Sequence, residues 1–260
     1  LTDSRIGNQL IVAGRLGGTR DMGVTIHEVI VNAANSNLGS GNVMLGGFIE
    51  NEGADLATGK HTLTVDRVEF NATAGTVMQH FYAGGRADNG VLTVKEAVIS
   101  LENSTSGNIY GGGYSDGCGK NIVENVTITV GTGSTVRNVI AGGHNAGSTV
   151  ENATVEIAGG TVQYSVYGGG NNAAVENATV ILSGGAVAGD VKAGNVAGSQ
   201  SVGSAQVVFK GSAYTSVAGT VSGAGADRST LVFDAFTGNL DLKVQGFTGV
   251  EVRSGSKVTF

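Results

Sequence analysis

Six segments of this chain repeat one pattern of valines at nearly constant intervals. Steps of 29, 29, 27, 25 and 27 residues separate Val65, Val94, Val123, Val150, Val175 and Val202. Three, five and seven residues after each valine the chain again carries an apolar residue, and the residues between these positions are mostly polar. Alternation with a period of two is typical of a strand with one buried face. The pattern therefore predicts one such strand in every repeat.

A second apolar column follows the first five of these strands. Its members are Phe81, Ile109, Val139, Val166 and Val191. A corner rich in Gly and Asn comes next, as in "YGGG" at 167–170, and a short third stretch leads back to the valine. Units of this size cannot bury an apolar face alone, so they must stack. We expect an all-β fold, a right-handed, single-stranded parallel β-helix with about 25–30 residues and three short strands per turn.

The chain is expected to form one continuous solenoid in three parts. Residues 1–61 match the repeat loosely and would form irregular first turns, whereas 62–229 would form the regular turns. In 230–260 the bulkier Phe236 and Phe247 would cap the core. The chain has 45 glycines but no proline and no G-X-Y period, which excludes collagen. A net charge of −6 disfavours nucleic acid as a partner.

The register also predicts which outward side chains meet on adjacent turns. Asp66 would lie beside Lys95, and Arg67 beside Glu96. Asn125, Asn152 and Asn177 would form a ladder of amides, and each also begins an Asn-x-Thr sequon. The sequons fit either glycan attachment or repetition of one strand-start motif. Glycine corners can bind phosphate when a helix follows, but here a strand follows, which favours a structural role for the glycines.

Two groups of residues are candidates for binding. Two corners, 47–61 and 112–120, are longer than the others and should project from one edge. Together with the turn after Tyr82 they would bring together Glu50, Glu52, Asp55, Arg86, Asp88 and Asp116. Tyr82 and Tyr110 should face outward on adjacent turns, with Tyr167 two turns further on. Such a stripe either binds sugars or partners or stabilises the coil by stacking.

The sequence indicates no catalytic group, metal ligand set or cofactor. Asp116 lies in the glycine-rich "GGGYSDGCG", but the other corners carry no carboxylate at that place, whereas a calcium site needs several. No nucleophile and base share a repeat position, and His80 is the best local candidate for a functional histidine. The single Cys118 excludes an internal disulfide.

The C-terminal segments "TLVFDAFTGNL" and "VQGFTGVEVRSGSKVTF", which follow turns with "YGGG" corners, resemble the passenger region of bacterial autotransporter (type V secreted) surface proteins. The resemblance covers about residues 62–260. It implies a right-handed β-helix that is exported across two membranes, after removal of a signal peptide, and displayed on a Gram-negative cell. We therefore expect a fragment of a longer, extracellular protein.

The same resemblance implies adhesion or self-association, so we expect a non-enzymatic adhesin or spacer. Its partner would be a host or bacterial surface glycan or protein, or a second copy, with no nucleic acid and no direct membrane insertion. No serine-protease domain precedes the repeats in this sequence, so the protease members of the family are a poor guide. The alternative function is a polysaccharide-binding or polysaccharide-degrading β-helix of the tailspike or lyase type. It would use Tyr82, Tyr110 and the acidic edge.

Overall fold

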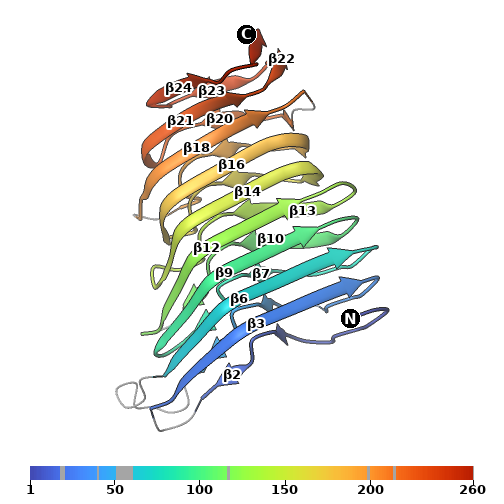
Figure 1. Cartoon of the computed structure of the whole chain (residues 1–260), viewed down its shortest axis with the longest axis vertical. Coiled ribbons are helices and arrows are strands. Elements are labelled where there is room, and N and C mark those ends of the chain that lie inside the picture. Colours follow the sequence, from blue (N-terminus) through green and yellow to red (C-terminus); the bar gives the residue numbers. More distant parts are fainter. Residues whose placement is uncertain are drawn as a thin grey trace.

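The computed structural model describes residues 1–17, 21–39, 41–50, 61–115, 118–197, 200–212 and 215–259, and these residues form strands and loops without a helix. The strands wind into one solenoid, and equivalent strands of successive turns lie side by side and run parallel (Figure 1). The predicted all-β parallel β-helix is confirmed. Its strands form three stacks, which we call the first, second and third stack in the order in which the chain visits them from a long strand.

The first stack contains the long strands, which carry the alternating pattern. Its members are β3 (Gly23–Ala34), β6 (Thr62–Thr73), β9 (Val91–Leu101), β12 (Lys120–Val130), β14 (Ser148–Val162), β16 (Ala174–Val187), β18 (Val202–Lys210), β21 (Ala226–Asp234) and β24 (Gly249–Val252). The predicted column from Val65 to Val202 is paired residue by residue through all six strands. The alternation therefore sets both the strand and its register, because a slip of one residue would turn every apolar side chain outward.

The second and third stacks consist of shorter strands. The second contains β1 (Leu10–Ile11), β4 (Val43–Met44), β7 (Phe81–Tyr82), β10 (Thr105–Tyr110), β13 (Thr135–Ile140), β15 (Val166–Tyr167), β17 (Val191–Lys192), β20 (Thr220–Ser222) and β23 (Lys243–Gln245). β19 (Ser216–Val217) pairs with the end of β16. The third contains β2 (Arg15–Leu16), β5 (Phe48–Ile49), β8 (Arg86–Ala87) and β11 (Tyr114–Ser115).

The three strands of a turn are thus unequal in length, and the third is confined to the N-terminal turns. Beyond β11 the described part of this stretch retains one isolated bridge, between Asn171 and Ala197. The repeat shortens at the same place, from steps of 29 residues to steps of 25 to 27. Fewer residues then remain for the third stretch, so it closes the turn as a loop.

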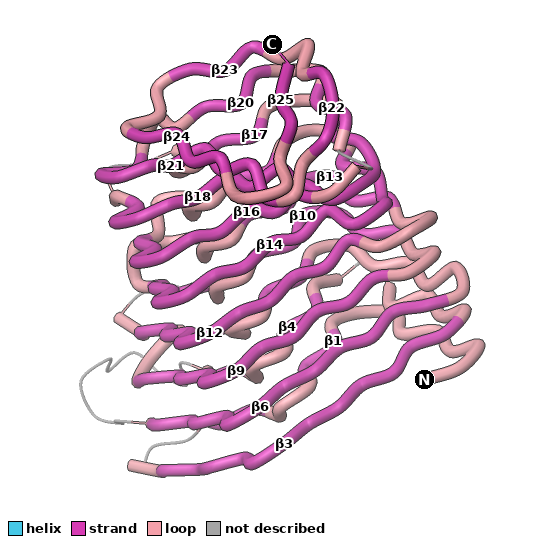
Figure 2. The backbone as a smooth tube through the Cα atoms, turned by 45° about the horizontal axis from the view of Figure 1, so that its top comes forward, coloured by secondary structure: helices cyan, strands magenta, loops and turns pink. Residues whose placement is uncertain are grey.

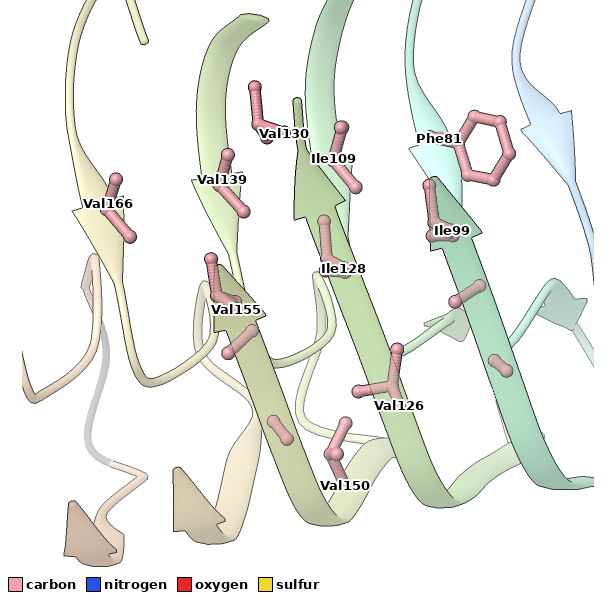
Figure 3. Close-up of a cluster of buried hydrophobic side chains, with 14 of the residues drawn as sticks. Phe81, Ile99, Ile109, Val126, Ile128, Val130, Val139, Val150, Val155 and Val166 are labelled. Atoms are coloured by element: carbon pink, nitrogen blue, oxygen red, sulfur yellow. The ribbon is translucent and has the colours of Figure 1, made fainter. Parts of the chain in front are cut away.

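The core lies between the first and second stacks (Figure 3). Ile99, Ile128 and Val155 from the long strands face the interior together with Phe81, Ile109, Val139 and Val166 from the second stack, and all seven are 0% exposed. Complete burial of such a side chain stabilises the fold by about 1.5–3 kcal/mol. One layer is added by every turn, so the core is continuous along the coil.

The glycine corners are required by close backbone approach. A Cβ on Gly142 would lie 2.7 Å from the Cα of Gly170, one turn away, and a Cβ on Gly112 would lie 2.6 Å from the backbone nitrogen of Gly143. Neither glycine has a positive φ. The corner segments of successive turns therefore touch, and any side chain there would push the turns apart.

The two ends of the coil are built differently from each other (Figure 2). β3 already pairs in register with β6, so residues 23–34 are part of the stack. At the other end, Phe236 is 0% exposed and packs against Phe209 and Phe233. β22 (Thr237–Asn239) and β25 (Lys257–Thr259) form a separate parallel pair. Val250 and Val252 continue the inward columns of β21 but are 63% and 59% exposed, so Phe236 fills the core without covering its last layer.

Candidate functional site

The predicted acidic edge lies beside the third stack. Arg86 Nε is 2.7 Å from Asp88 Oδ1, and Glu50 forms an ion pair with Arg15. Glu50 directly follows β5, and Asp88 directly follows β8, which pairs with β5. The other predicted members of this edge, Glu52, Asp55 and Asp116, lie outside the described residues. The described carboxylates of the edge are therefore each held by an arginine.

Five side chains in this region form a column that runs across successive turns, which we call the corner column. It contains Arg15, Phe48, Arg86, Tyr114 and His144. The guanidinium carbon of Arg15 lies 5.4 Å from the centroid of the Phe48 ring, and that of Arg86 lies 5.0 Å from the same centroid. The Tyr114 and His144 rings are 5.3 Å apart. Cations and aromatic rings thus alternate in its first four members. In this arrangement each guanidinium group is attracted to the face of a neighbouring ring.

Tyr82 and Tyr110 stack as predicted but do not form an exposed stripe. Their rings lie 4.9 Å apart and are inclined by 2°, yet the residues are only 6% and 5% exposed. They point away from the main core and are covered by Tyr114 and His144 of the corner column, with Met44 and Ile140 on either side. Because the corner folds the third stretch over the second stack, these rings form a small second core, and the stacking interpretation is the correct one.

Burial has an electrostatic consequence for both tyrosines. Desolvation raises the pKa of Tyr82, and the neighbouring Tyr110 and Tyr114 raise that pKa further. Desolvation also raises the pKa of Tyr110. Both hydroxyl groups therefore stay neutral to a higher pH than the hydroxyl group of an exposed tyrosine does. Tyr167 is half-buried, and the Lys192 ammonium group lies 5.7 Å from the centroid of its ring.

A polar ladder runs along the outward side of the second stack. The backbone N–H of Asn108 donates to His80 Nδ1 at 3.1 Å, and Asn138 Nδ2 donates to Asn108 Oδ1 at 2.9 Å. The N–H of Ser165 donates to Asn138 Oδ1 at 3.0 Å, and the N–H of Asp190 donates to Ser165 Oγ at 3.1 Å. Burial lowers the pKa of His80, and the charges of Arg137 and His144 lower it further.

Arg137 and Tyr164 lie next to this ladder, and the sequence prediction missed them. The Arg137 guanidinium carbon is 5.3 Å from the centroid of the Tyr164 ring on the next turn. Tyr164 and Arg137 each lie two residues before a valine of the second apolar column, and these two valines, Val166 and Val139, pair with each other. The predicted column therefore already placed the tyrosine opposite the arginine, but the prediction considered only the column of Tyr82, Tyr110 and Tyr167.

The outward side of the first stack carries the predicted pairs. Lys95 Nζ is 2.7 Å from Asp66 Oδ1, and Arg67 Nε is 3.1 Å from Glu96 Oε2. Hydrogen bonds from Lys95 and His27 lower the pKa of Asp66. These ion pairs link adjacent turns at exposed positions, where screening by solvent keeps the contribution of each pair to stability small.

The predicted amide ladder also lies on the first stack. Asn177 Nδ2 donates to Asn152 Oδ1 at 3.1 Å, and Asn152 Nδ2 donates to Asn125 Oδ1 at 3.2 Å. Glu124, Glu151 and Glu176 each directly precede a ladder asparagine and lie at the surface. The first stack thus presents a regular polar surface with a line of carboxylates.

The described residues contain no group of three or more His, Cys, Asp or Glu side chains that could hold a metal ion. In the same part of the chain, no helix is long and apolar enough to cross a membrane. No family model matches the sequence, and no curated protein or solved structure shows significant similarity to it.

Proposed function

We propose that this chain is a non-enzymatic binding module displayed at the surface of a Gram-negative cell, an adhesin that also acts as a spacer. The observation that supports the proposal is the arrangement of its outward side chains in lines along the coil. The asparagine ladder on the first stack and the ladder from His80 to Asp190 on the second each add one member per turn. Repeated groups on a continuous surface suit contacts that are individually weak and collectively strong.

The resemblance of residues 62–260 to autotransporter passenger regions gives the location of the module in this proposal. A coil of parallel strands is well suited to that location, because its length grows with every turn while each turn contacts only its neighbours. The long axis of the coil, from β3 to β24, would then hold a binding face away from the cell (Figure 1).

The test is adhesion by the chain itself. Purified protein coupled to beads is expected to retain the beads on glycan-coated or cell-coated surfaces, compared with beads that carry albumin. Sedimentation of the free protein shows in parallel whether copies associate. Beads that bind none of these surfaces, together with a strictly monomeric chain, would contradict the proposal. Release of reducing sugar from a glycan would instead support the polysaccharide-degrading alternative.

A further inference from the structure

The Arg137–Tyr164 pair is an open platform on the outward side of the second stack. Tyr164 is 54% exposed, and Arg137 is exposed as well. The backbone N–H of Tyr164 donates to the Arg137 carbonyl oxygen at 2.9 Å, so the two residues occupy directly adjacent turns. Their stacking holds the guanidinium group over one face of the phenol ring. Tyr82 and Tyr110 are buried, whereas this ring is open to solvent.

Glycines on the neighbouring turns leave the platform uncovered. Gly107 stands beside Arg137, because Ser106 pairs with Val136 and Asn108 with Asn138. A Cβ on Gly107 would lie 2.2 Å from the carbonyl oxygen of Gln79, and a Cβ on Gly189 would lie 2.5 Å from that of Tyr164. Backbone contact therefore requires glycine on both sides of the pair. The same requirement removes the side chains that would otherwise cover the guanidinium group and the ring.

Polar groups of the same face surround the pair. Asn138 follows Arg137 directly, and its amide is held in place by Asn108 and by the backbone of Ser165. On the other side, Thr135 pairs with Thr161 across the same two turns. These amide and hydroxyl groups repeat at the strand spacing of about 4.8 Å. An exposed ring flanked by oriented amides and hydroxyls matches a sugar, which has an apolar C–H face and a polar rim.

The charge of this face identifies the kind of sugar. The chain carries a net charge of −6, yet among the described residues Arg137 forms no ion pair with a carboxylate. Burial lowers the pKa of His80, and the nearby Arg137 and His144 lower it further. The nearby Asp190 accepts a hydrogen bond from the Thr220 N–H and lies 3.4 Å from Lys192 Nζ. A guanidinium group recognises a carboxylate with two parallel hydrogen bonds.

We propose that Arg137, Tyr164 and Asn138 form a binding site for a carboxylated saccharide. The Arg137 guanidinium binds the sugar carboxylate, the Tyr164 ring stacks on the C–H face, and Asn138 and the adjacent threonines bind hydroxyl groups. This site rests on the proposed adhesive function, because it supplies the ligand class for that function.

Calorimetric titration of the purified chain with trigalacturonate and with sialyllactose tests the site. We expect binding of at least one of these sugars, and at least tenfold weaker binding of the same sugar after reduction of its carboxyl group. Arg137→Gln and Tyr164→Ala should each weaken binding about tenfold, whereas Tyr164→Phe should retain it. Arg228→Gln, at an exposed arginine of β21 on the first stack, is the matched control and should bind normally.

The proposed site is overturned if the chain binds neither acidic sugar. It is also overturned if the chain binds the carboxyl-reduced form as tightly as the acidic form. Unchanged affinity in both Arg137→Gln and Tyr164→Ala also overturns it. The bead assay separates this failure from failure of the proposed function. If beads that carry Tyr164→Ala adhere as well as beads that carry the wild type, the chain is adhesive but the adhesive site lies elsewhere. Sugar binding without any bead adhesion supports the site and contradicts the adhesive role.

Discussion

The Arg86 guanidinium group lies between the rings of Phe48 and Tyr114, with its central carbon 5.0 Å from one ring centroid and 5.2 Å from the other. The three residues come from consecutive strands of the third stack, and Asp88 binds the Arg86 Nε at 2.7 Å. The side chain is 29% exposed, so the contact is partly shielded from water. A single cation therefore joins three turns at the position where the third stretch folds over the second stack.

Replacement of this cation should destabilise the coil. We expect Arg86→Met to lower the free energy of unfolding by about 1–2 kcal/mol, because it removes two cation–π contacts and leaves Asp88 without this partner. The free energy of unfolding of Arg86→Lys should lie between those of Arg86→Met and the wild type, since an ammonium group keeps the charge but not the planar stacking. Urea unfolding measures the effect. Arg228→Met, at an exposed arginine, is the control, and an equal loss in both variants would contradict the role of the column.

The corner glycines should tolerate no side chain. A Cβ on Gly84 would lie 2.2 Å from Asn121 Oδ1 and 2.8 Å from the backbone nitrogen of Gly113. Gly84→Ala is therefore expected to cost about 1–3 kcal/mol or to prevent folding, as overpacked cores do. Gly7→Ala, where a Cβ would meet nothing within 4 Å, should change stability by no more than about 0.5 kcal/mol. Thermal unfolding of Gly84→Ala and Gly7→Ala measures the difference. Similar unfolding midpoints for the two variants would refute the explanation that close backbone approach requires glycine at the corner.

The middle rung of the asparagine ladder should contribute more than the surface positions around it. Asn152 both donates to Asn125 and accepts from Asn177, so Asn152→Ala should cost about 1 kcal/mol. Asn152→Asp should cost more, since the new carboxylate would face the Asn125 Oδ1 atom and lie near Glu124, Glu151 and Glu176. Thr127→Ala, on the exposed side of β12, is the control for denaturant unfolding. A ladder without energetic value would show all three variants within error of the wild type.

Stability should fall as the pH drops through the range in which His80 titrates. The pKa of His80 is lowered in the folded chain, chiefly by burial, so the unfolded chain binds a proton at a higher pH than the folded one does. Below about pH 6.5 the free energy of unfolding should therefore decrease with falling pH until the folded form is protonated as well. His80→Gln should show a smaller decrease between pH 7 and 5. Parallel curves for the two proteins would assign the pH dependence to other groups.

The sequence predicted the inward columns well because each depends on a local alternation that repeats in register. The pairing of Val65 through Val202, the ion pair of Asp66 with Lys95 and the asparagine ladder all follow from that register. The prediction was wrong about the exposure of Tyr82 and Tyr110, which face away from the main core and are nevertheless buried. Whether an outward side chain meets water depends on how sharply the corner turns, and no period in the sequence encodes that angle.

The sequence by itself therefore determined the parallel coil, the register of its strands and the composition of its core, since these follow from which residues alternate and recur. Only the tertiary structure decided which outward residues are covered and which are open. It buried Tyr82 under the corner column and left Tyr164 exposed beside Arg137, although both are tyrosines near the second stack. The physical reason is that this exposure depends on how the third stretch folds against the second stack, which is an arrangement between turns that no local pattern encodes.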